Sequence, residues 1–157
     1  MRDGRGRQVS DTLAEVRAEI EALHDFFTGW FSGTLPESGE VFAHGLGDHL
    51  HPEFEIVLPS GTVCDRDGLL TPVRQAWGTN PDFRAVVRDV RVLGEWPHGK
   101  SGGESGAGLV LATYVEVQTG ARNTTPADNL RHATALFERR AGRLVWRHLH
   151  ETAFDAD

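Results

Sequence analysis

The sequence predicts an α+β fold, with helices on one face of a mainly antiparallel sheet. Apolar residues recur at steps of three and four near the N-terminus, as on an amphipathic helix. Apolar and polar residues then alternate with a period of two through most of residues 83–154. Consecutive strands with short links are antiparallel neighbours, because parallel pairs need a long crossover. Helices first and strands afterwards are typical of an α+β domain.

The first helix is expected to begin at Thr12, which fits a capping box with Glu15, and to end at Gly33. Its apolar stripe consists of Leu13, Val16, Ile20, Leu23, Phe27 and Trp30. Residues 1–10 are expected to form a disordered tail, and residues 11–157 a single domain, because 157 residues suit one ordinary domain.

The remaining elements are two shorter helices and six strands. We expect helices over residues 37–44 and 66–78, and strands over 54–58, 62–64, 83–96, 109–119, 129–140 and 143–154.

Composition excludes several classes of function. Cys64 is the single cysteine, so an internal disulfide and any multi-cysteine metal site are excluded. The net charge of −7 argues against a broad nucleic-acid-binding face. No apolar run has the length of a membrane span, and the N-terminus lacks the apolar core of a secretory signal. These features predict a cytoplasmic protein that binds neither nucleic acid nor membrane.

The sequence also indicates no cofactor and no metal ion. Residues 94–101 match the phosphate-loop pattern, but the glycine-rich stretch after Ser101 cannot begin the helix that this loop requires. No nicotinamide or flavin motif is present. His44, His49 and His51 lie in a glycine-rich stretch that predicts a solvated loop, although metal ligands could be drawn from it.

His148 and His150 are the first candidates for catalysis. They lie two residues apart on a predicted strand and therefore share one face, together with Trp146, whereas Glu151 points the other way. One interpretation is a cavity wall with a general base. The other is a pair of histidines held in the sheet or at an interface between subunits. The sequence does not decide which face of this strand is concave.

Tyr114 and Glu116 are the second candidates. They share one face of the strand 109–119, and aliphatic residues occupy the other. The aliphatic face could point inward and leave the polar one in solvent. Alternatively, Tyr114 and Glu116 face a cavity as proton donor and base.

Aromatic residues supply the predicted walls of a binding pocket, although aromatics at helical and strand spacing are more often part of the core. The candidates for this pocket are Phe26, Trp30, Phe54, Trp77, His132 and Trp146.

Three stretches together resemble the nuclear transport factor 2-like superfamily, whose SnoaL-like domains form a cone. They are the opening helix with Phe26-Phe27-Thr-Gly-Trp30, the segment from Pro52-Glu-Phe54 to Leu70, and the closing hairpin from Phe137 to Thr152. The hairpin also resembles the association domain of calcium/calmodulin-dependent kinases. The resemblance implies a curved sheet wrapped around a long helix, a pocket inside the cone, and frequent homodimers. It does not imply one activity.

We therefore predict a homodimeric protein that binds a small, partly hydrophobic or aromatic ligand. One alternative is a cofactor-independent acid–base enzyme of the isomerase, cyclase or dehydratase type, using His150, His148, Tyr114 and Glu116. The other alternative is a non-catalytic association module.

Overall fold

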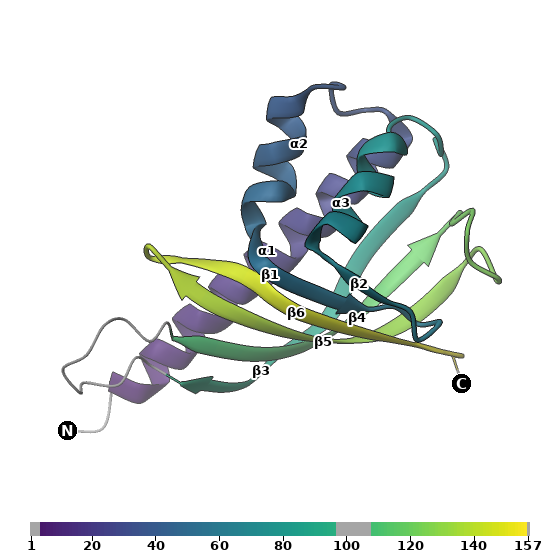
Figure 1. Ribbon diagram of the computed structural model, residues 1–157. Coiled ribbons are helices and arrows are strands. Elements are labelled where there is room, and N and C mark those ends of the chain that lie inside the picture. The colour runs from purple at the N-terminus through teal and green to yellow at the C-terminus, as the bar shows by residue number, and fades with distance from the viewer. Residues whose placement is uncertain (1–3, 97–107, 157) are drawn as a thin grey trace.

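The computed structural model describes the backbone of residues 4–96 and 108–156, and side chains from residue 11 onward. It contains three α-helices, one 3₁₀ turn and six strands (Figure 1). The helices are α1 (Gly4–Ser32), α2 (Gly39–Gly45) and α3 (Arg66–Gln75), and the 3₁₀ turn η1 is Gly47–His49. The strands are β1 (Leu50–Val57), β2 (Val63–Asp65), β3 (Arg84–Trp96), β4 (Leu109–Thr119), β5 (Asn129–Arg140) and β6 (Arg143–Phe154).

The six strands form one sheet in the order β2-β1-β6-β5-β4-β3. Every neighbouring pair is antiparallel except β1 with β6, which is parallel. Figure 1 shows α1 crossing the sheet on the same side as α2 and α3. The predicted α+β class, with helices on one face of a mainly antiparallel sheet, is confirmed.

The start of α1 differs from the prediction. The helix begins at Gly4, so Thr12 lies inside it and is not its N-cap. The Thr12 hydroxyl instead donates to Glu95 Oε2 at 2.8 Å, and Glu15 pairs with Arg139 at 2.7 Å. These partners come from distant strands, which a local capping rule does not consider. Residues 1–3 of the expected tail and residues 97–101 of the phosphate-loop match lie outside the described residues.

The core lies between α1 and the concave face of the sheet. The buried stripe of α1 contains Val16, Ile20, Leu23, Phe26 and Trp30. It packs in one cluster with inward-facing residues of the central strands, which are Val110, Ala112, Tyr114, Ala133, Ala135 and Phe137. Small alanines in the middle of this face leave room for the large side chains beside them.

A β-bulge at Arg147 reverses the faces of β6. Leu136 pairs with His148 but Phe137 pairs with Trp146, so Arg147 is an extra residue in the strand. As a result Trp146, Leu149 and Glu151 are all buried, while His150 is exposed. The prediction that Trp146 shares a face with His148 and His150 is wrong, because strict alternation along a strand fails across a bulge.

Within the described residues, none of the helices combines the length and the apolar character that a membrane span requires. The expected cytoplasmic location stays a prediction.

Candidate functional site

An inner cavity of about 140 Å³ lies between α1, β1, α3 and the concave face of the sheet. Its walls are mainly apolar and include Leu23, Phe27, Phe31, Leu50, Phe54, Ile56, Leu58, Leu69, Val73, Phe83 and Leu149. Its polar lining consists of His24, Glu116, Gln118, Arg131 and Glu151. An apolar space with a few convergent polar groups is typical of a small-molecule site.

Four elements bring the polar residues together. His24 lies on α1, four residues after Ile20, and is therefore on the buried side of the helix. Glu116 and Gln118 alternate inward on β4, and Arg131 of β5 is the direct partner of Glu116 in the sheet. The bulge in β6 turns Glu151 inward.

Hydrogen bonds and ion pairs join these side chains in a buried network. Gln118 Nε2 donates to Glu116 Oε1 at 2.7 Å, and His24 Nε2 lies 3.6 Å from Glu116 Oε2. The other ring nitrogen of His24, Nδ1, is 2.7 Å from the carbonyl oxygen of Ile20 and donates to it. Arg131 Nη1 donates to Glu151 Oε2 at 2.9 Å. Each carboxylate therefore has a cationic neighbour.

Burial and mutual contact move the pKa values of the two carboxyl groups in opposite directions. Burial opposes ionisation of Glu116, but contacts with His24, Arg131 and Gln118 outweigh it and lower the pKa of Glu116 to about 2. Burial and then the charge of Glu116 raise the pKa of Glu151 to about 8, against the opposing effect of Arg131. The two shifts are opposite in direction, so Glu151 is the carboxyl of the pair that favours the protonated form and Glu116 the one that favours the ionised form.

His24 is the third ionisable group of the site and lies beside Glu116. Burial acts to lower the pKa of His24, but the contacts with Glu116 and with the Ile20 carbonyl raise it overall. Perturbed carboxyl and imidazole groups that line one cavity are a physical signature of functional sites. The arrangement can give and take protons inside a mainly apolar space.

A second hollow of about 490 Å³ lies at the open end of β4, β5 and β6. Its ionisable side chains among the described residues are Asp128 and Asp155, and neither has a cationic partner lining the same hollow. It therefore has fewer groups that could transfer protons or bind a charged ligand than the smaller inner cavity. In the described part of the chain, no group of three or more His, Cys, Asp or Glu is placed to hold a metal ion.

Comparison with solved structures defines the fold. The chain is similar to a nuclear transport factor 2-like protein of unknown function from Pseudomonas aeruginosa, with 25% identity over 90% of this chain and 99% of that one, and a TM-score of 0.71. The chain has the nuclear transport factor 2-like fold. No protein-family model and no curated protein matches the sequence.

Two further solved structures show the same fold at lower identity. A proposed dehydratase of this family from Streptomyces avermitilis is 16% identical over 94% of this chain and 99% of that one, with a TM-score of 0.60. The CamKII hub homology domain from Chlamydomonas reinhardtii is 11% identical over 94% of this chain and 98% of that one, with a TM-score of 0.57. The predicted resemblance to this superfamily is thus confirmed.

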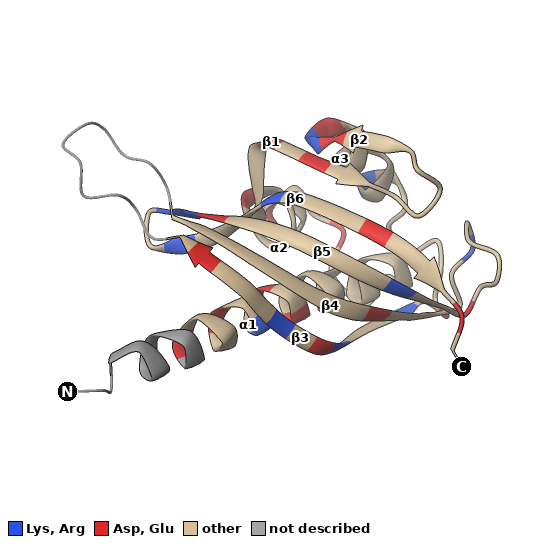
Figure 2. Ribbon diagram, turned by 90° about the horizontal axis from the view of Figure 1, so that it is seen from below, with Lys and Arg blue, Asp and Glu red and all other residues tan. Residues whose placement is uncertain are grey.

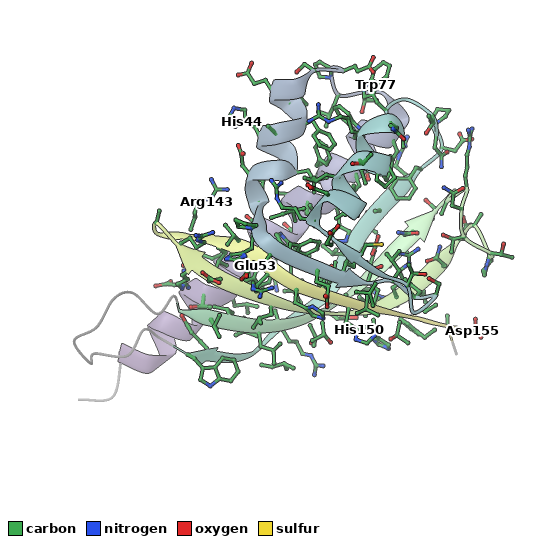
Figure 3. All side chains as sticks on the ribbon, viewed as in Figure 1. His44, Glu53, Trp77, Arg143, His150 and Asp155 are labelled. Carbon is green, nitrogen blue, oxygen red and sulfur yellow. The ribbon has the colours of Figure 1, made fainter. Side chains whose placement is uncertain are left out.

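The four predicted catalytic residues do not converge in the inner cavity. Glu116 lines the cavity. Tyr114 is buried on the same face of β4, with its ring 5.4 Å from that of His24, but it does not line the cavity. His148 contacts Glu55 at 3.7 Å outside the cavity, and His150 is exposed on the underside of the sheet (Figure 3).

Among the predicted pocket residues, Phe54 lines the cavity and the others lie elsewhere. Phe26 and Trp30 stack in the core with ring centroids 5.5 Å apart, and the Trp30 indole donates to the Val73 carbonyl. Trp77 donates to the Leu35 carbonyl, at the helical end of the molecule in Figure 3.

The last two predicted pocket residues lie on opposite faces of the sheet. His132 is exposed and stacks on Phe154 with centroids 3.9 Å apart. Trp146 is buried against Phe137, and its indole donates to Glu19 at 3.2 Å. Neither residue lines the inner cavity.

Sequence reasoning missed His24, Arg131 and Glu151. A signal existed for His24, because it occupies a position on the apolar stripe between Ile20 and Phe27. Arg131 on β5 and Glu151 on β6 gave no such signal, because their contact depends on the register in which the two strands pair.

Proposed function

We propose that the inner cavity binds a small, partly apolar molecule and that Glu151 transfers a proton to or from it. The observation that carries this proposal is the buried Glu116–Glu151 pair, flanked by His24 and Arg131, in the lining of a mainly apolar cavity.

The size of the cavity supports a small ligand. An apolar cavity of about 150 Å³ is known to accommodate benzene, and the inner cavity has about 140 Å³. Eleven apolar residues surround that space, so the body of the ligand is apolar. The polar residues then face one part of the ligand and orient it.

Glu151 is the group best matched to proton transfer near neutral pH. General acids and bases are most effective when their pKa lies near the working pH, and the pKa of Glu151 is about 8. Arg131, 2.9 Å away, stabilises the carboxylate that forms when Glu151 gives up its proton. Glu116 is a positioning residue whose charge raises the pKa of Glu151. It accepts a hydrogen bond from Gln118 and lies beside His24.

Isomerisation by proton transfer fits these groups. The carboxylate of Glu151 takes a proton from one carbon of the substrate and, as the carboxylic acid, returns it to another. The proton is conserved, and no electrons are exchanged with the protein. The reaction therefore requires only an acid–base group, an apolar cavity and a fixed orientation of the substrate.

The test is the ring opening of 5-nitrobenzisoxazole, in which a base removes the ring C–H proton as the N–O bond breaks. We expect the wild-type rate to rise with pH through about 8, as Glu151 ionises. Glu151→Gln should abolish that rise, whereas Glu37→Gln, at an exposed position, should retain it. A wild-type rate no faster than that of free acetate, or an unchanged profile in Glu151→Gln, would contradict the proposal.

We also propose that the protein forms a homodimer through the face of the sheet that none of the described helices covers. Val86, Leu93 and Trp96 on β3 are 59%, 55% and 54% exposed. Figure 2 shows that charged residues are sparse along the central strands β4 and β5. Exposed apolar residues on a sheet surface favour association.

Light scattering after size-exclusion chromatography tests the dimer. We expect twice the mass of the chain for the wild type and a shift to monomer for Leu93→Asp. A monomeric wild-type protein would refute the dimer. A larger ring without activity toward the benzisoxazole would instead favour the association module.

A further inference from the structure

We infer that the molecule bound in the inner cavity is a small carboxylate, whose charged group lies in an adjoining outer cleft beside Arg122 and Arg131. This inference rests on the proposed function, because it assigns the chemical class of the ligand of the same site.

The outer cleft is a separate hollow of about 390 Å³ next to the inner cavity. The two spaces share four lining residues, which are Phe31, Phe83, Gln118 and Arg131. The rings of Phe31 and Phe83 meet edge to face with centroids 5.1 Å apart. The two spaces are therefore adjacent, and a ligand that occupies both passes beside Gln118 and Arg131, because the two rings already touch.

The outer cleft is basic although the chain is acidic. The whole protein has a net charge of −7. Among the described residues, however, the lining of the cleft includes Arg122 and Arg131 and no carboxylate. Asn123 and Thr124 also line the cleft and add polar side chains. A cleft lined by charges of one sign attracts ligands of the opposite sign.

Arg131 connects the cleft to the buried carboxyl pair. Its Nη1 donates to Glu151 at 2.9 Å, and its Nη2 donates to the hydroxyl of Thr124 at 3.3 Å. The Thr124 contact is long and links Arg131 to a residue of the outer cleft. A carboxylate is a stronger acceptor than a neutral hydroxyl, so it can replace Thr124 at Nη2.

Arg122 supplies the second guanidinium. It is exposed, and its Nη1 donates to the backbone carbonyl of Thr79 across the cleft. This bond uses one of the five N–H donors of the side chain and leaves others for a ligand. The two arginines therefore present cationic donors from the loop after β4 and from β5.

The inner cavity does not favour a cation in place of an anion. Its two carboxyl groups already contact His24 and Arg131. A cationic ligand would meet both guanidinium groups in the cleft without a free carboxylate to balance them. The apolar body of a compact carboxylate matches the inner cavity, and its charged group can pair with the arginines of the outer cleft. A neutral molecule can fill the inner cavity but gains no ion pair in the cleft.

Three isosteric probes separate these possibilities: benzoate, benzamide and the cation benzamidine. Isothermal titration calorimetry should show that benzoate binds at least about tenfold more tightly than benzamide, with benzamidine the weakest. Arg122→Gln should remove most of the preference for benzoate, and Arg122→Lys should retain part of it. Arg91→Gln, an exposed arginine on β3, is the matched control and should behave as the wild type.

Each outcome decides the inference. A preference for benzoate that Arg122→Gln removes and Arg91→Gln retains supports it. Equal binding of benzamide and benzoate, or a preference that Arg122→Gln does not change, overturns it and leaves the proposed function standing. Binding of none of the three probes contradicts the proposed function and the inference together. Circular dichroism of each variant confirms that a lost preference does not reflect a lost fold.

Discussion

Replacing Glu151 with Gln should flatten the pH dependence of the free energy of unfolding between pH 5 and pH 6.5. Burial and the neighbouring charge of Glu116 raise the pKa of Glu151 to about 8 in the folded protein, against 4.5 for an ordinary glutamate. The folded protein therefore keeps a proton that the unfolded chain releases. A raised pKa contributes stability that is present at low pH and is lost as the pH rises.

The expected magnitude follows from that difference of one proton. Each pH unit within the window changes the free energy of unfolding by about 1.4 kcal/mol. The unfolded carboxyl is already partly ionised at pH 5, so the wild type should lose about 2 kcal/mol between pH 5 and pH 6.5. Toward the upper end of this window the raised pKa values of His24 and His49 begin to add losses of the same sign, so the measurement stops at pH 6.5.

Urea denaturation at several pH values across the window measures this slope. The Gln side chain is neutral at every pH, and its amide can keep the hydrogen bond from Arg131. The slope should therefore fall to the smaller part that the histidines contribute in Glu151→Gln and persist in full in Glu37→Gln, at an exposed position. Parallel wild-type and Glu151→Gln curves would refute the conclusion that Glu151 holds a proton.

Two further predictions concern the scaffold. In Gly45→Ala the new Cβ would overlap the buried ring of Phe26, so thermal denaturation should show a loss of about 1–3 kcal/mol in the free energy of unfolding. In the control variant Gly39→Ala the new Cβ meets no neighbour within 4 Å, so the stability should hardly change. Asp89 has a φ of 56° in a bulged part of β3, so Asp89→Gly should raise the melting temperature through a gain of about 1 kcal/mol, and a fall would contradict the reasoning.

The sequence predicted the sheet better than the site. Alternation gave the bounds of β4, β5 and β6 as the structure has them, because these strands carry apolar residues on a regular buried face. It also placed Tyr114 and Glu116 on one face of β4, and the structure shows that this polar face points inward.

The bulge at Arg147 was not visible in the sequence, because an extra residue leaves the composition of the strand unchanged. Without it, Trp146 and Glu151 fall on opposite faces, and the buried carboxyl pair cannot be inferred. His24 gave a weak signal, since a single histidine on an apolar helix face is usually a residue of the core. The contact between Arg131 and Glu151 depends on the register of β5 and β6.

The most direct test of the account is a titration of the glutamate side-chain carboxyl carbons by ¹³C NMR. We predict that one resonance titrates near pH 8 and disappears in Glu151→Gln, while Glu116 remains ionised down to about pH 2. If every glutamate resonance of the wild type completes its titration below pH 6, Glu151 holds no proton at neutral pH. The acid–base role proposed for the cavity would then be contradicted.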